Sequence, residues 1–347
     1  MDIEAIEAWL REESIEALEV LWQRADAVRS ETVGNEVHLR GLIEISNYCI
    51  RQCGYCGLRF GNREVERYRL SDGEILACAR QAMDFGYGTM VLQAGEDYGI
   101  EQAWLADIVR AIKTETPLAV TLSMGERPPE DLAAWRDAGA DRYLLRFETS
   151  DPELYRRIHP DARGERSDRL AILRDLRKLG YETGSGIMLG IPGQTYGAVA
   201  KDLALFRTLD LDMIGVGPYI SHPATPLGQG EWTEPASPRE QTPNNELLTY
   251  KAIALTRILC PEANIPSTTA LATLNRAGGR ELGLQRGANV VMPNLTPVEY
   301  RAKYEIYPAK ACITETADLC KECLNHRLRM LGREPGKGAG SRRHVLK

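Results

Sequence analysis

Residues 45–62 read ISNYCIRQCGYCGLRFGN, with three cysteines, Cys49, Cys53 and Cys56, at C-x3-C-x2-C spacing. Three thiolates so close together in sequence lie on one short loop. No fourth Cys or His follows nearby, which argues against a structural zinc site because such sites usually have four ligands. Iron–sulfur clusters are held by thiolates. The stretch therefore predicts a [4Fe–4S] cluster bound at three corners, with its fourth iron open to bind another molecule.

The same spacing, with Tyr55 directly before the third cysteine, resembles the signature of radical S-adenosylmethionine (SAM) enzymes. The resemblance implies that the open iron binds the amino and carboxylate groups of SAM. It also implies that the reduced cluster cleaves SAM to methionine and a 5′-deoxyadenosyl radical. From the motif alone, a zinc site or a chance grouping of cysteines is the alternative.

The composition narrows the class of protein. The chain has 347 residues, 43% of them hydrophobic, which is enough for one large core. A formal net charge of −6 argues against general nucleic-acid binding. No apolar run approaches the roughly 18–20 residues that span a membrane, and the acidic N-terminus predicts an amphipathic helix and not a signal peptide. We therefore expect a cytoplasmic monomer whose eight cysteines include metal ligands and no disulfides.

From residue 37 onward, short apolar or β-branched runs alternate with amphipathic segments. The expected strands are residues 37–46, 89–94, 118–123, 142–148, 183–189, 212–219, 265–270 and 288–292. Gly86 and Gly180 fall where helix C-termini need a left-handed residue. Eight strand–helix units predict a complete (β/α)8 TIM barrel, with a doubly wound open sheet as the alternative.

The barrel is expected to span residues 37–300, with short additions at both ends. Residues 1–36 carry apolar side chains at helical spacing and predict a helical cap. Residues 301–330 form a C-terminal segment. Residues 331–347 contain glycine, proline and many basic side chains and predict a flexible tail.

Polar residues at the C-terminal ends of barrel strands are candidates for the site, because barrel active sites form there. The three cysteines follow the first expected strand, and Gln93 lies near the end of the second. Arg146 and Glu148 share one face of the fourth strand, since side chains alternate along a strand. Burying charge is costly unless it is paired, so this pair predicts either a ligand-holding cavity or a satisfied network. Hydroxyls at other strand ends join the set: Thr121, Ser123, Thr268 and Thr269.

A second group of cysteines, Cys312, Cys320 and Cys323, follows the last expected strand at C-x7-C-x2-C spacing. This group suits either zinc or an iron–sulfur cluster, and His326 is a possible fourth ligand. The tyrosine-rich residues 300–308 lie between this group and the barrel, where they could close over its top.

Several stretches together resemble the HydE family of [FeFe]-hydrogenase maturases over residues 35–335. They are ISNYC (45–49), YCGLR (55–59), VLQAGED (91–97), AGADRYLLR (138–146), LGYETG (179–184), MPN (292–294) and YEIYPAK (304–310). The resemblance implies a complete (β/α)8 barrel with the radical cluster at its top. It also implies a second surface cluster at Cys312, Cys320 and Cys323, [2Fe–2S] or [4Fe–4S], which some members lack and which activity does not require.

The family resemblance also assigns roles to single residues. Glu148 is expected to contact the ribose of SAM and Arg169 its carboxylate. The full expected SAM set is Tyr55, Gln93, Glu148, Arg169, Met213, Tyr304 and Ile306. The expected substrate cavity below it is lined by Thr121, Ser123, Arg146, Thr268, Thr269 and Tyr307.

The implied reaction is a step in building the diiron subcluster of the hydrogenase H-cluster. The implied substrate is an organometallic mono-iron species bearing carbon monoxide, cyanide and cysteine. Expected partners are an electron donor such as ferredoxin or flavodoxin and the maturases HydG and HydF. Methylornithine synthase and biotin synthase are related alternatives. Biotin synthase carries its second cluster on strand cysteines, which no expected strand here contains. A carrier of iron–sulfur clusters that makes no radical is the alternative from another class.

Overall fold

The computed structural model describes residues 1–162, 166–232, 236–311, 313 and 317–342, with only the backbone at 318–320. Its centre is a parallel sheet in the order β6-β5-β4-β3-β2-β1-β7, with β8 paired to β1 alone. The strands are β1 (Glu36–Ser46), β2 (Thr89–Ala94), β3 (Ala119–Ser123), β4 (Arg142–Leu144), β5 (Glu182–Leu189), β6 (Met213–Pro218), β7 (Val290–Val291) and β8 (Glu334–Pro335). The expected parallel α/β architecture is therefore confirmed.

Residues 264–267 lie between the two ends of this sheet. Asn264 forms a single parallel bridge to Met213 of β6, and Pro266 forms one to Val290 of β7. The expected strand at 265–270 is thus reduced to single bridges, because Pro266 has no N–H for a ladder and α10 already begins at Thr269.

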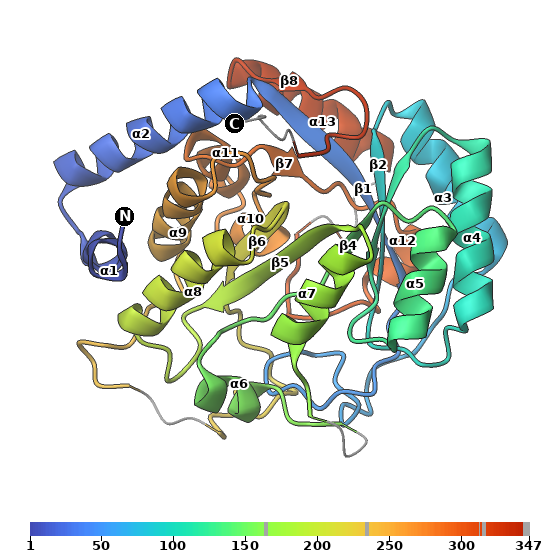
Figure 1. Cartoon of the computed structure of the whole chain (residues 1–347), viewed down its shortest axis with the longest axis horizontal. Helices are drawn as coiled ribbons and strands as arrows, with labels where there is room; N and C mark the ends of the chain where they lie inside the picture. Colours follow the sequence, from blue (N-terminus) through green and yellow to red (C-terminus); the bar gives the residue numbers. More distant parts are fainter. Residues whose placement is uncertain (163–165, 233–235, 312, 314–316, 343–347) are drawn as a thin grey trace.

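Helices surround the sheet on its outer side (Figure 1). They are α1 (Ile3–Arg11), α2 (Ile15–Val33), α3 (Asp72–Asp84), α4 (Gln102–Glu115), α5 (Pro129–Asp137), α6 (Pro152–Ile158), α7 (Arg169–Lys178), α8 (Tyr196–Thr208), α9 (Glu246–Leu259), α10 (Thr269–Leu274), α11 (Gly279–Gln285), α12 (Val298–Arg301) and α13 (Ala317–Met330). The N-terminal helices are those expected, and they pack on the outside of the sheet's helical layer, α1 against α8 and α9, and α2 against α9. Within the described residues, no helix is long and apolar enough to cross a membrane.

Local sequence explains several helix boundaries. Ser71 and Glu74 form a capping box that starts α3, each side chain bonding the other residue's backbone N–H. Gly86 and Gly180 have φ of 76° and 84°, directly after the ends of α3 and α7. Both glycines therefore occupy the left-handed position that the sequence predicted.

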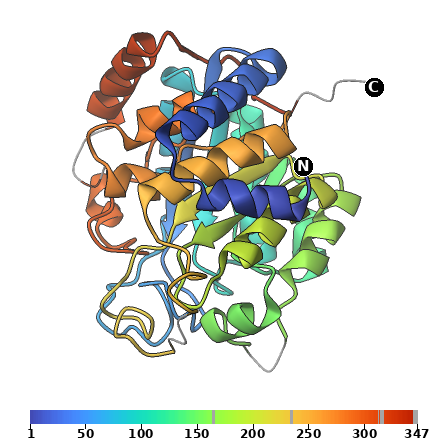
Figure 2. The same ribbon diagram turned by 90° about the vertical axis from the view of Figure 1, so that its left-hand side faces the viewer.

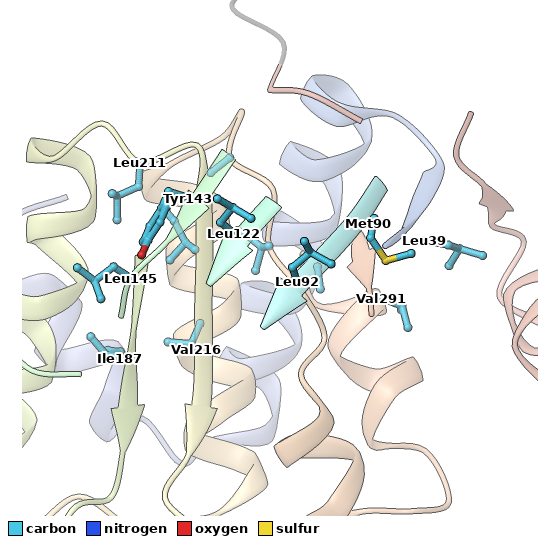
Figure 3. Packing of buried hydrophobic residues seen from close by; sticks show 14 of the residues in the cluster. Leu39, Met90, Leu92, Leu122, Tyr143, Leu145, Ile187, Leu211, Val216 and Val291 are labelled. Carbon is cyan, nitrogen blue, oxygen red and sulfur yellow. The ribbon is translucent and has the colours of Figure 1, made fainter. Parts of the chain in front are cut away.

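The apolar face of the sheet packs against the helices and forms the main core. Parallel pairing aligns Ile43 with Leu92, and Leu92 with Leu122, across three neighbouring strands. Figure 3 shows Leu92, Leu122 and Tyr143 together in this layer. Side chains alternate along each strand, so the other face of the same strands points into the interior of the curved sheet. That interior face carries the site.

The fourth strand is shorter than expected and ends at Leu144. Leu145 still donates to the carbonyl of Gly184 at 2.9 Å, and Glu148 rejoins β5 through a bridge to Ile187. Between Leu145 and Glu148 the chain leaves the sheet, and Arg146 in this stretch lines the cavities described below.

In the tail expected at 331–347, residues 331–342 lie against the strands, whereas residues 343–347 lie outside the described part of the chain. Whether the tail is flexible stays a prediction. β8 pairs with the start of β1, and residues 336–342, which we call the C-terminal plug, continue under the N-terminal ends of the strands. The glycines of the plug permit a very close approach. A Cβ on Gly88 would lie 1.6 Å from the carbonyl oxygen of Gly338. Nothing in the sequence around Gly88 or Gly338 predicts that these two glycines contact each other.

Candidate active site

The cysteine loop, residues 47–71, connects β1 to α3 and lies at the C-terminal end of the sheet with α6 (Figures 1 and 2). Arg67 holds the two halves of the loop together by donating to four backbone carbonyls. These belong to Asn47, Leu58, Arg59 and Asn62. The folded loop places Cys49, Cys53 and Cys56 on the wall of one cavity of about 280 Å³, here called the upper cavity.

The three thiols are in a buried environment. Burial raises the pKa of each, that of Cys56 to about 12. A metal must therefore displace the thiol protons when it binds. Among the described residues, no three Cys, His, Asp or Glu side chains lie close enough to share one metal ion. A cluster does not need that closeness, because each thiolate binds a different iron. The arrangement fits a [4Fe–4S] cluster better than a single zinc ion.

Most of the predicted site residues line the upper cavity. They are Tyr55, Gln93, Ser123, Arg146, Glu148, Arg169, Tyr304, Ile306 and Tyr307. Gln93 Nε2 donates to the hydroxyl oxygen of Tyr304 at 3.2 Å. The C-terminal segment therefore reaches over the end of β2. Arg146 Nη2 lies 3.1 Å from Glu148 Oε2, so the charged pair faces inward as expected.

Glu148 is held in an unusual backbone conformation. Its φ is 62°, which costs a non-glycine residue roughly 1–3 kcal/mol. Backbone hydrogen bonds to Gly186 at 3.1 Å and from Met188 at 3.2 Å keep it there. Such strain is often found where a side chain must be aimed at a ligand, and this one aims a buried carboxylate at the cavity.

Some polar atoms at the cavities have no partner in the protein. The Nη1 of Arg51, the Nε of Arg146 and the Oγ1 of Thr121 are buried and make no hydrogen bond within the described part of the chain. An unsatisfied buried polar group costs about 1–3 kcal/mol. Unused donors and acceptors at a cavity wall indicate a polar ligand, which is what SAM would be.

A lower cavity of about 170 Å³ lies deeper between the strands. It is lined by Thr121, Arg146, Met213, Thr268, Thr269 and Tyr307 from the predicted set. Gln93, Arg146, Ile306 and Tyr307 line both cavities, so the two adjoin. Ser123 lines the upper cavity only.

Met213, which the resemblance names as a SAM contact, stays a prediction in that role. It lines the lower cavity, and its sulfur accepts a hydrogen bond from Arg40 Nη1 at 2.8 Å. Met213 begins β6 and so lies away from the C-terminal end where the cysteine loop sits.

Sequence analysis missed three charged residues of the lower cavity, Arg40, Glu44 and Lys310. Lys310 Nζ lies 2.7 Å from Glu44 Oε1, and both side chains are buried. Burial raises the pKa of Glu44, an effect that Lys310 opposes. Alternation along β1 puts Arg40 and Glu44 on one face, a signal that was available. Nothing local to Lys310 indicates its partner, which is 266 residues away in sequence.

The second cysteine group is described only in part. Cys323 and His326 are exposed on α13, which both views place at the opposite end of the sheet from the cysteine loop (Figures 1 and 2). Cys312 and the side chain of Cys320 lie outside the described residues. The predicted site therefore stays a prediction.

The fold and the thiol-lined cavity define the chain as a radical SAM enzyme, and residues 43–206 match the family model described as the Radical SAM superfamily. The chain is 46% identical over 331 residues to the [FeFe] hydrogenase maturase subunit HydE of Thermotoga maritima, covering 94% of this chain and 90% of that protein. It belongs to the HydE family of maturases.

Similarity extends to related enzymes. The chain is 31% identical over 307 residues to 3-methylornithine synthase of Methanosarcina acetivorans, covering 86% of this chain and 82% of that protein. The crystal structure of methylornithine synthase (PylB) matches with a TM-score of 0.80 at 27% identity, over 96% of this chain and 94% of that one. The strand–helix architecture is therefore shared beyond the maturases.

Proposed function

We propose that this chain cleaves SAM reductively at a [4Fe–4S] cluster on Cys49, Cys53 and Cys56, and that it acts in assembly of the diiron subcluster of [FeFe]-hydrogenase. The observation that carries the first part is the upper cavity, where three buried thiols adjoin polar groups with unused hydrogen-bonding capacity. The second part rests on the 46% identity to a HydE maturase. When bound, the cluster would supply the electron that splits SAM into methionine and the adenosyl radical.

In this proposal the chain's own residues orient SAM. Arg169 binds its carboxylate, Glu148 accepts from its ribose hydroxyls, and Tyr55, Gln93, Tyr304 and Ile306 enclose the rest. The hydrogen bond between Gln93 and Tyr304 supports this role, because it fixes the C-terminal segment over the cavity. Met213 completes the proposed set from the wall of the adjoining lower cavity.

The lower cavity is proposed to hold the substrate, an organometallic iron species with carbon monoxide, cyanide and cysteine ligands. Arg146, Thr121, Thr268, Thr269 and Tyr307 offer the donors that anionic ligands need. We further propose that residues 264–267 close the sheet into a complete (β/α)8 barrel, supported by their bridges to β6 and β7. An enclosed barrel would exclude water and stray hydrogen donors from a reactive radical.

Methylornithine synthase activity is the second candidate, favoured by the TM-score of 0.80 to PylB. Its 31% identity is well below the 46% to the maturase. A biotin synthase-like role is disfavoured because none of the strands in the described chain contains a cysteine. Lysine is an isomer of 3-methylornithine, so the reduced enzyme incubated with SAM and lysine tests the second function. Formation of 3-methylornithine would favour that function over the maturase.

The first test is cleavage of SAM. The anaerobically reconstituted, reduced protein should form 5′-deoxyadenosine, and Cys53→Ala should reduce this to background. Cys78→Ala is the matched control, since Cys78 is also buried but lies in α3 away from the cavity. Wild-type levels of 5′-deoxyadenosine from Cys53→Ala would remove the radical assignment.

A second iron–sulfur cluster on Cys312, Cys320 and Cys323 is also proposed, together with docking of a ferredoxin or flavodoxin and of HydG and HydF. Replacing Cys49, Cys53 and Cys56 with alanine in one variant tests the cluster. Iron and sulfide that remain after reconstitution belong to the second site. A variant free of iron contradicts it.

A further inference from the structure

The carboxylate of Glu126 joins three separate parts of the chain beside the upper cavity. Its Oε1 accepts from Arg169 Nε at 2.9 Å and from Ser167 Oγ at 2.6 Å. Its Oε2 lies 3.0 Å from Arg51 Nη2. Arg51 belongs to the cysteine loop, Arg169 is the first residue of α7, and Ser167 lies just before that helix. One side chain from the β3–α5 loop therefore connects the cysteine loop to the guanidinium expected to meet SAM.

Arg169 is fixed at each of its nitrogens. Besides Glu126, it donates through Nη1 to the carbonyl of Arg146 at 2.6 Å and contacts His159 Nε2 through Nη2. An arginine only donates, so Nε2 of His159 must accept, and the ring proton lies on Nδ1. Burial and the nearby Arg169 lower the pKa of His159, which keeps the ring neutral. The guanidinium thus has one defined plane.

The charges in this cluster balance. Arg51 pairs with Glu96 at 2.6 Å as well as with Glu126, giving two guanidiniums and two carboxylates, all largely buried. Removing one partner of a buried ion pair is strongly destabilising, because the other charge stays buried. Glu126 is therefore essential to the balance, and its loss leaves both arginines short of an acceptor.

Glu126 acts on the cavity only through others. Arg51, Glu96 and Arg169 line the upper cavity, but Glu126 does not. We propose that Glu126 is a positioning residue that aims Arg169 at the carboxylate of SAM and ties that arginine to the cysteine loop through Arg51. This inference rests on the proposed function, in which the upper cavity binds SAM.

The test is Glu126→Gln in the cluster-loaded protein. Glutamine turns one acceptor into an NH2 donor that faces an arginine. The dissociation constant for SAM should rise at least tenfold, and the change that SAM causes in the electron paramagnetic resonance spectrum of the reduced cluster should need correspondingly more SAM. Iron content should stay at the wild-type level. Glu126→Asp keeps the charge and should recover part of the affinity.

Asp131→Asn is the matched control. Asp131 pairs with Arg127 Nη2 at 2.6 Å, is similarly buried and does not line the cavity. It should lower the melting temperature without changing SAM affinity. If Glu126→Gln prevents folding, Ser167→Ala removes only one bond to the same carboxylate and should raise the dissociation constant two- to fivefold.

The outcomes separate the two claims. If wild-type protein does not bind SAM, the proposed function fails. If wild-type protein binds SAM and Glu126→Gln binds it equally well, only the positioning role fails, and the carboxylate is merely structural.

Discussion

The cavities and the N-terminal end of the sheet differ in what lies against their buried polar side chains. Along the two cavities, Arg51, Arg146 and Thr121 each keep a buried polar atom without a partner in the described chain. At the N-terminal end, the C-terminal plug supplies acceptors to the strands. The carbonyl of Ala339 accepts from Thr89 and Arg142 at 2.9 Å each.

Further contacts of the plug extend this pattern. Gly340 accepts from Arg40 at 3.1 Å and from Asn264 at 3.0 Å. Arg342 pairs with Asp210 at 2.7 Å. At the cavities, buried donors and acceptors are left free for a ligand. At the N-terminal end of the sheet, the C-terminal plug supplies partners for buried side chains, and these bonds stabilise the fold.

The largest expected effect comes from removing the plug. A chain that stops after Pro335 leaves Arg142, which is fully buried, without Ala339 and Ser341 as acceptors. At about 1–3 kcal/mol for each lost bond, the free energy of unfolding should fall by roughly 5 kcal/mol or more, measured by urea denaturation.

Removing only residues 343–347 is the control for this truncation, because it keeps every contact named above. Equal stability of the two truncated chains would mean that the plug does not close this end of the sheet.

A pH effect on stability is expected from Asp202, a buried residue of α8. Asp202 accepts from the N–H of Ser150 at 2.6 Å, two residues after Glu148, and burial raises its pKa to about 7. The unfolded chain releases this proton near pH 4, so stability falls as the pH rises from about 4 to about 7. A gap of about three units corresponds to about 4 kcal/mol.

Asp202→Asn should therefore lose most of this dependence, because asparagine does not titrate. Urea unfolding of both proteins at pH 5 and pH 8 measures the difference. Parallel pH profiles for wild type and variant would show that Asp202 does not carry the effect.

The smallest expected effect compares two buried threonines, Thr89 and Thr121, whose exposed fractions are 1% and 2%. Thr89 bonds both Ala339 and Arg142, whereas Thr121 Oγ1 has no partner in the described chain. Thr89→Val should cost about 1–3 kcal/mol, and Thr121→Val should be neutral or slightly stabilising. Thermal unfolding of the two variants tests this, and a reversed order would contradict the comparison of the cavities with the N-terminal end.

Sequence reasoning located the parts of the site that depend on short-range pattern. The cysteine spacing on one loop and the alternating hydroxyls of β3, Thr121 and Ser123, follow from local pattern. The Arg146–Glu148 pair also lines the upper cavity, but strand alternation is not the reason, because β4 ends at Leu144 and Glu148 has a φ of 62°. Sequence reasoning did not place Met213, which the structure puts at the start of β6 on the wall of the lower cavity. It missed Glu126 and Lys310, whose partners come from distant segments.

The sequence by itself determined that a thiol-bearing loop follows the first strand of a parallel α/β fold, because cysteine spacing and alternating apolar runs are local and periodic. Only the tertiary structure decided how that loop is fixed. Glu126 meets Arg51 and Arg169, Lys310 meets Glu44, and the plug meets Arg142 through contacts between segments far apart in the chain. Such contacts depend on three-dimensional packing, and neither partner carries a local signal that identifies the other.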